Sequence, residues 1–534
     1  MRCSPTHIRR LAVAWYLATA VLLALQLAYA ATLVVEIDGV RWWGVSDDIY
    51  ITACYARSLA EGHGAVWYAG AAPVEGYSNP LWMLVLCVVH AMPGYTEPQL
   101  GLWVHSLQAL LCLLCSALAW RVCLRLVDRA GGVCGPPGPG LVSLVFLLGL
   151  SWASLPLWLA DGFELGLVAA ASLSCLLVTM DGVEAGRRLA GGGARCALAG
   201  ALSGVCLWTR LDGLLVCLPA LGLLLAQAFG RAGRRPWSEL LAAPAVLGVC
   251  AAALLLARHA VYGEWLPNTY WLKLAGWPLA DRLAMGFEQN SAALAATACA
   301  TAFTVFGCRR LLGAAYPIVV LLAGSSFAMV AYSTHNGGDS WALRAGWDRF
   351  GAIGALYLAA ALVVVVVRAP AVAWRPAAPP AMAACCLLVS WGHLPFDRGT
   401  TTMRRQLTGE YQRSERRFLE WGLAYKHASR EGARALIGAA GAIVYSSRRA
   451  ALDGLGKCDP WVARQPVNLP RKTSGHNKRY MDALYLRDMP EFGRHEPPPE
   501  VRARYGRYEC RGAELWVRRD ATLVRWDRLR PLDP

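Results

Sequence analysis

Charged residues are scarce in this chain of 534 residues. They make up 16% of it, against about 25% in an average soluble protein. Hydrophobic residues reach 56%, and the mean hydropathy is positive. With so little charge the chain is not an ordinary soluble protein. The composition predicts a polytopic membrane protein, in which several apolar helices cross a bilayer.

Long apolar runs are missing from the last quarter of the chain. Residues 395–534 carry 28 Lys or Arg and 17 Asp or Glu, whereas residues 1–394 carry 24 and 19. This shift predicts a transmembrane domain over 1–394 and a C-terminal α/β domain over 395–534. The basic domain suits an anionic membrane surface, an anionic glycan or a lipid phosphate. Alternatively, its high arginine usage simply reflects a GC-rich genome. Tethering to so many spans argues against nucleic acid as a partner.

Cysteines with the spacing of metal ligands are also missing. Most of the 18 cysteines lie inside apolar runs, where they act as small hydrophobic residues. No pair has zinc-ligand spacing with a histidine in support. Only Cys458 and Cys510 fall in the C-terminal domain. In an oxidising compartment these two could form a disulfide, and otherwise they are free thiols.

Apolar runs predict about 11 transmembrane helices, at approximately 11–35, 100–120, 141–160, 163–180, 196–211, 213–229, 240–258, 291–307, 311–332, 351–367 and 379–394. The run 81–92 is too short to cross a hydrocarbon core of about 30 Å, so we expect it to lie in the outer interface. With a cytoplasmic N-terminus, inner loops then hold 16 arginines and outer segments only 8 basic residues. The chain is thus predicted to be a multi-pass protein of the inner (plasma) membrane, with an extracytoplasmic C-terminal domain.

Two adjacent carboxylates, Asp47 and Asp48, stand in the predicted first outer loop, residues 36–99. Two like charges so close resist desolvation unless something uses them. One carboxylate can accept a proton from a hydroxyl, while its neighbour positions the nucleophile or holds a divalent cation. The alternative is structural: Asp47 caps a helix that begins near Ile49, and Asp48 is solvated beside it.

Other polar residues gather on the same predicted outer face. Lys273 is the only lysine in the first 394 residues and could bind a phosphate as a point charge. Arg349 precedes a span, where it could bind phosphate or extend to lipid headgroups. Arg210 and Asp212 could simply pair with each other, and His63 between two glycines could simply be a turn residue.

Several segments resemble one known family. Residues 47–82 read DDIYITACYARSLAEGHGAVWYAGAAPVEGYSNPLW, and further matches are DGFE (161–164), RLDGLL (210–215), YGEWLPNTYWLK (262–273), GGDSW (337–341) with DRF (348–350), and AIVYSSRRAALDGLGKCDPWVAR (442–464). This series resembles the GT-C membrane glycosyltransferases of the mycobacterial terminal β-(1,2)-arabinofuranosyltransferase family. The similarity covers nearly the whole chain, and the first and fourth segments are the most specific. Leu211 departs from the family pattern, which has a proline there.

The resemblance implies a GT-C fold and a glycosyltransferase activity. The donor would be a sugar on polyprenyl phosphate, with arabinofuranose as one candidate sugar, and the acceptor a cell-envelope glycan. Asp47 and Asp48 would be catalytic, and the C-terminal domain would bind or orient the acceptor. The candidate substrate-binding residues are Tyr50, Arg57, His63, Glu75, Tyr77, Asn79, Glu164, Arg210, Asp212, Asn268, Tyr270, Lys273, Asp339 and Arg349.

Two alternatives stay open at this point. The first is a protein or lipid A glycosyltransferase of the same fold. The second is a membrane transporter, because polar residues in spans also mark transport paths. A transporter is expected to show repeated halves with interrupted helices. The sequence shows no such repeat, which favours the enzyme.

Overall fold

The computed structural model describes residues 5–132, 139–184, 192–230, 237–339, 349–368, 412–470, 472 and 475–532. The chain folds into two compact units. Unit 1 comprises Met1–Tyr29, His105–Leu254 and Leu283–Arg404, and unit 2 comprises Ala30–Val104, Leu255–Arg282 and Arg405–Pro534. The predicted domain boundary at 394/395 and the predicted span 379–394 lie outside the described residues.

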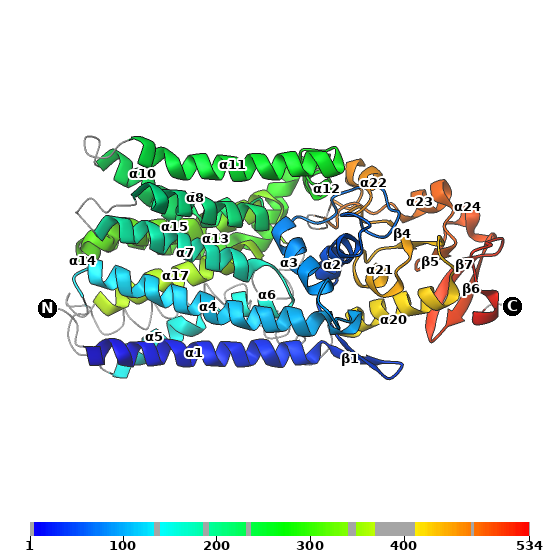
Figure 1. Ribbon diagram of the computed structural model, residues 1–534, viewed down its shortest axis with the longest axis horizontal. Coiled ribbons are helices and arrows are strands. Elements are labelled where there is room, and N and C mark those ends of the chain that lie inside the picture. Colours follow the sequence, from blue (N-terminus) through cyan, green and yellow to red (C-terminus); the bar gives the residue numbers. More distant parts are fainter. Residues whose placement is uncertain are drawn as a thin grey trace. The chain divides into compact units, whose positions relative to one another are not determined.

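Seven helical segments among the described residues are long and apolar enough to cross a membrane. They are α1 (Pro5–Thr32), α4 (Leu100–Arg129), α5 with α6 (Pro139–Leu150, Ser154–Ala160), α11 (Trp237–Tyr262), α13 (Leu279–Gly307), α14 with α15 (Arg309–Leu312, Tyr316–His335) and α17 (Arg349–Arg368), drawn in Figure 1. The predicted polytopic helical architecture is therefore confirmed.

Three further predicted spans correspond to helices outside this set of seven. The spans at 163–180 and 196–211 are α7 (Leu165–Glu184) and α8 (Gly192–Thr209). The span at 213–229 is divided into α9 (Gly213–Val216) and α10 (Leu218–Gly230). The division falls just before Pro219, because proline is tolerated in the first turn of a helix but not in its interior.

The core of unit 1 is built around α17. Every residue of this helix from Gly351 to Val367 is buried, as expected for a helix that is apolar on all sides and enclosed by others. It packs closely on α15, where the Ser326 hydroxyl donates to the Gly354 carbonyl over 2.7 Å. A Cβ on Gly354 would lie 3.1 Å from the Ser326 Cα, so glycine permits this close approach.

In unit 2, the first loop begins with a hairpin of β1 (Val34–Ile37) and β2 (Val40–Trp43), turning at Asp38–Gly39 with both φ angles positive. The helices α2 (Asp47–Ala60) and α3 (Pro80–His90) and the 3-10 turn η1 (Glu97–Gln99) follow. The helix expected over 81–92 is thus present as α3. Its 11 residues reach only about 16 Å, well short of a hydrocarbon core.

The C-terminal part of unit 2 contains a six-stranded sheet in the order β4-β3-β5-β7-β6-β8. Its strands are β3 (Arg434–Ile437), β4 (Ala450–Asp453), β5 (Phe492–Gly493), β6 (Tyr505–Cys510), β7 (Ala513–Arg518) and β8 (Arg530–Pro531). Strand β3 pairs in parallel with β4 and β5, and the other pairs are antiparallel. The accompanying helices are α20 (Gln412–Ala428), α21 (Ala442–Ser447), α22 (Pro460–Arg464), α23 (Met481–Asp488) and α24 (Pro499–Arg502). The predicted α/β class of this part is confirmed.

Two helix contacts hold the sequence segments of unit 2 together. Helix α2 of the first loop packs on α21, and α12 (Asn268–Leu274) packs on α22. The first loop, the segment around α12 and the C-terminal sheet therefore form one body. Cys458 and Cys510 are both buried free thiols, so the disulfide left open by the sequence is absent from the structure.

Candidate active site

The two adjacent carboxylates begin helix α2. Ser46 is the residue that precedes the helix, and Asp47 is its first residue, so Asp47 does not cap α2 as the structural alternative required. The Asp47 side chain turns instead to the C-terminal segment, where its Oδ1 accepts a hydrogen bond of 2.8 Å from the Ala442 amide. Only 8% of Asp47 is exposed. The segment 47–82 thus places a buried carboxylate against α21.

Burial shifts the protonation of Asp47. The pKa of its carboxyl is raised to about 6, mainly by desolvation and in smaller part by the neighbouring Asp48 charge, which together outweigh the lowering effect of the Ala442 amide and of Lys457. A carboxyl with a pKa near 6 is poised to accept a proton close to neutral pH.

Asp48 forms an ion pair with Lys457, whose ammonium donates to Asp48 Oδ1. Burial alone would lower the pKa of Lys457, but the charges of Asp48 and Asp47 raise it above its ordinary value. Lys457 therefore stays charged. Lys457 is not among the residues predicted from the sequence, although it lies within the matching segment 442–464, because 409 residues separate it from Asp48.

Asn268 holds the backbone beside Lys457 in place. Its side-chain amide donates to the carbonyl oxygens of Gly456 and Lys457, over 3.0 and 2.9 Å. Its own backbone amide donates to the Glu75 carbonyl over 3.1 Å. The Glu75 carboxylate in turn binds the guanidinium of Arg258, with both side chains almost fully buried. Asn268 and Glu75 therefore act as supports for the carboxylate pair.

Other residues predicted in the first loop are also engaged inside unit 2. Arg57 binds Glu97 and donates to the Tyr445 carbonyl, and Asn79 accepts a hydrogen bond from Thr52.

The ring of Tyr50 packs on Tyr445 at 5.0 Å, and the Tyr77 hydroxyl lies 2.9 Å from that of Tyr262. His63 is about half exposed and lies 4.0 Å from Glu61. Most of the predicted first-loop residues are thus held by contacts inside the unit that carries Asp47 and Asp48.

Helix α12 carries two further predicted residues. Tyr270 is 39% exposed and meets Trp271 edge to face. Lys273 lies near Gly475, where a Cβ would stand 3.9 Å from Lys273 Cε. Both residues belong to the same unit as Asp47 and Asp48.

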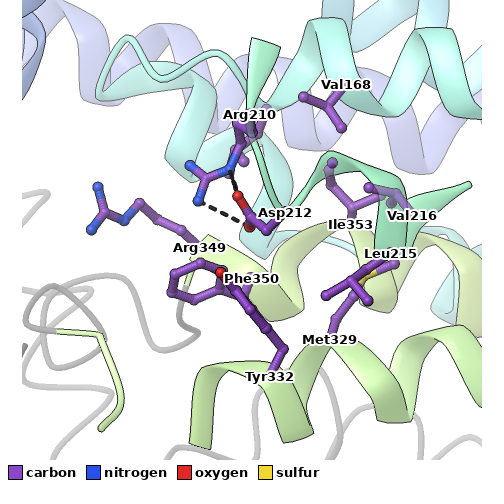
Figure 2. Close-up of a pocket in the computed structure, with 12 residues that line it drawn as sticks. Val168, Arg210, Asp212, Leu215, Val216, Met329, Tyr332, Arg349, Phe350 and Ile353 are labelled. Atoms are coloured by element: carbon purple, nitrogen blue, oxygen red, sulfur yellow. Dashed lines mark hydrogen bonds and ion pairs between the residues drawn. The ribbon is translucent and has the colours of Figure 1, made fainter. Parts of the chain in front are cut away.

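The remaining predicted residues cluster in unit 1. Arg210 binds both Glu164, over 2.6 Å, and Asp212, over 3.0 Å. Figure 2 shows this pair beside a small cavity of about 20 Å³, which is room for little more than one water molecule. Arg349 extends away from Asp212 in Figure 2 and binds both carboxylate oxygens of Asp339, over 3.0 and 3.1 Å. Arg210 and Arg349, like Arg57 in unit 2, are thus already paired with carboxylates.

Metal-ligating side chains do not gather in groups of three or more within the described ranges. A divalent ion at Asp47 and Asp48 would take further ligands from a bound substrate, because phosphate oxygens are common partners of such ions.

No family model matches the chain, and no curated protein sequence matches it. Among solved structures, it is similar to the archaeal oligosaccharyltransferase AglB from Archaeoglobus fulgidus in complex with an inhibitory peptide and a dolichol-phosphate. The two share 12% sequence identity and a TM-score of 0.45, over 97% of this chain and 75% of that one.

Proposed function

We propose that this chain is a GT-C membrane glycosyltransferase. It transfers a sugar, with arabinofuranose the first candidate, from polyprenyl phosphate to a hydroxyl of a cell-envelope glycan at the outer face of the plasma membrane. One observation carries the proposal. A buried carboxyl with a raised pKa, Asp47, stands beside the ion-paired Asp48 at the start of the helix that follows the first membrane span.

The reaction requires a base and a stabilised leaving group. Asp47 takes the proton of the acceptor hydroxyl as its oxygen attacks the anomeric carbon of the donor sugar. The new carbon–oxygen bond forms as the bond to the phosphate oxygen breaks, and the electron pair leaves with the lipid phosphate. Asp48, fixed by Lys457, orients the reacting groups.

The departing phosphate needs positive charge nearby. Lys273 supplies it in this proposal, since it lies in the same unit as the carboxylates. Arg349 was the second predicted ligand, and its two-point contact with Asp339 would have to be exchanged for the phosphate. Arg349 also belongs to unit 1, so this proposal assigns the phosphate to Lys273, whereas Lys457 is already bound to Asp48.

The test is a transfer assay with purified protein in lipid nanodiscs, polyprenyl-phospho-arabinofuranose as donor and an arabinofuranosyl oligosaccharide as acceptor. Asp47→Asn and Asp48→Asn should each lower turnover by at least about 100-fold, in the range for a positioned acid or base. Asp527→Asn, at a position whose side chain is 74% exposed, is the matched control. Near-normal transfer by both site variants would remove the first loop from the chemistry. Transfer to a peptide or to lipid A instead of the oligosaccharide would reassign the acceptor.

A further inference from the structure

The C-terminal sheet domain carries an open cleft of about 520 Å³. Ligand pockets usually measure about 300–1,000 Å³. The cleft lies where the loop before α23 meets the segment that follows β5. Its polar lining consists of Asn468, Arg479, Tyr480, Asp482, His495 and Glu496.

The floor of the cleft is rigid. Met481 is 5% exposed and belongs to the hydrophobic core formed with Leu436 and Leu484. A Cβ on Gly438 would lie 2.9 Å from the Met481 Cε and 3.2 Å from the His495 Nε2, so both side chains rest directly on that glycine. A preformed floor reduces the ordering cost of binding.

The walls are also held in place by hydrogen bonds. The Asn468 side chain exchanges two hydrogen bonds, of 2.9 and 2.7 Å, with the backbone of Arg479. The Tyr480 hydroxyl donates to the Pro466 carbonyl, and its ring meets Trp461 edge to face at 5.8 Å. The lining therefore combines a fixed aromatic ring, an amide, a guanidinium and carboxylates.

The mixture of charges favours a neutral ligand. Arg479 shares the lining with two carboxylates, Asp482 and Glu496, and Glu496 is itself paired with Arg502. A phosphate or an anionic headgroup in this cleft would meet two carboxylates. Burial lowers the pKa of His495 to about 4, so its imidazole is uncharged near neutral pH and offers one donor and one acceptor. Sugar hydroxyls match such alternating donors and acceptors, and the apolar face of a sugar ring packs on an aromatic side chain.

The cleft is connected to the carboxylate site through one short segment. Gly438, beneath Met481 and His495, is followed by Gly441 and Ala442, and the amide of Ala442 donates to Asp47. We propose that the cleft binds a neutral oligosaccharide, namely the part of the acceptor glycan remote from the hydroxyl that receives the sugar. This inference rests on the proposed function, because it assigns the cleft to the acceptor of that reaction.

The test uses full-length protein in nanodiscs and two probes, an arabinofuranosyl tetrasaccharide and an arabinofuranosyl disaccharide. Binding is measured by titration calorimetry and transfer is measured separately. Arg479→Ala combined with Asp482→Ala should raise the tetrasaccharide Kd and KM by at least about tenfold, as expected for losing two charged hydrogen-bonding groups. The turnover number and the KM for the disaccharide should be unchanged. Asp527→Ala combined with Arg528→Ala removes one charge of each sign from an exposed position and is the control.

The outcomes separate this inference from the proposed function. If wild type transfers sugar and the cleft variant binds the tetrasaccharide as tightly as wild type, the cleft assignment is wrong and the function stands. The opposite result is that neither probe accepts sugar, while wild type binds the tetrasaccharide and the cleft variant binds it more weakly. The cleft assignment then stands and the proposed function does not. Binding of phosphatidylglycerol vesicles that is lost in Arg479→Ala, with no oligosaccharide binding by wild type, would overturn the inference in favour of a lipid surface.

Discussion

At the scale of residues, Asp47 and Asp48 are chain neighbours that meet different surroundings. Asp47 is buried against a backbone amide, and burial raises the pKa of its carboxyl to about 6. Asp48 is tied to the ammonium of Lys457. Where the environments of two carboxyls differ in this way, their roles differ as well. Asp47 is therefore the base in our proposal, and Asp48 the fixed negative charge beside it.

The raised pKa of Asp47 predicts a pH dependence. Only the ionised carboxylate accepts a proton, so kcat/KM should rise as the pH increases through about 6. Stability should change in the opposite direction. Because its pKa is higher in the folded protein, the Asp47 carboxyl adds to the free energy of unfolding when it is protonated. This contribution is fully present below about 3.9, the pKa of an aspartate in the unfolded chain, and it is lost as the pH rises through about 6. A pH–rate profile of wild type checks the first statement, and thermal unfolding of wild type against Asp47→Asn across the same range checks the second.

Removing the charge of Lys457 should move that profile. The ammonium lowers the pKa of Asp47, so Lys457→Met should shift the rising limb to higher pH, and Lys457→Arg should shift it less. Lys472→Met, at an exposed lysine of the same unit, is the matched control. An unmoved limb in Lys457→Met would mean that Asp47 is not the titrating base.

Gly441 allows α21 to approach the carboxylate site. A Cβ at this position would lie 1.8 Å from the backbone oxygen of Asp47 and 2.9 Å from its Oδ1. Gly441→Ala should therefore destabilise unit 2 by about 1–3 kcal/mol or more and separate Asp47 from the Ala442 amide. Gly248→Ala, at a helical position with open space around it, should be neutral or slightly stabilising. Thermal unfolding and transfer rates decide the matter, and wild-type behaviour of Gly441→Ala would contradict the close approach.

At the scale of elements, α12 acts on the site through Asn268. Asn268→Ala leaves the carbonyls of Gly456 and Lys457 without their amide donor, at a cost of about 1–3 kcal/mol. The loop that carries Lys457 should then loosen. The pH–rate limb should move in the same direction as in Lys457→Met, by a smaller amount. Asn268→Asp should be worse, because its carboxylate would face two carbonyl oxygens. Gln465→Ala, an exposed amide of the same unit, is the control. A rate loss with an unshifted limb would restrict Asn268 to general stability.

The sequence predicted some of these elements better than others. Apolar runs located the long helices, since a helix that crosses lipid must be apolar over most of its length. They did not predict the break between α9 and α10, because apolar residues continue through it and only Pro219 marks the position. The role of Asn268 as a support also went unseen. The motif marked the residue, but its partners are 188 and 189 positions away.

At the scale of the whole molecule, composition divides the chain at one point, whereas the structure interleaves it. Unit 2 collects the first loop, the segment around α12 and the C-terminal sheet, from three separate stretches of sequence. No local sequence pattern predicts that these three stretches assemble, because the contacts between them, such as α2 on α21, join segments that are far apart in the chain. The carboxylate pair was predictable from its motif, but its partners Ala442 and Lys457 required the fold.

The last prediction concerns the orientation of the chain. The arginine bias places the end of α4 inside the cell, provided that α3 does not cross the membrane. At 11 residues α3 is too short to do so.

Reporter fusions after Gly94, Arg129 and Pro395 should therefore read outside, inside and outside. Each position tests a different step: Gly94 follows α3, Arg129 ends α4, and Pro395 stands where the sequence predicts the C-terminal domain to begin. If the Gly94 fusion reads inside and the Arg129 fusion outside, then α3 crosses the bilayer and every later segment is inverted. The carboxylates precede α3, so the C-terminal domain that binds them would then have to be reached from the opposite face, which the Asp48–Lys457 ion pair forbids.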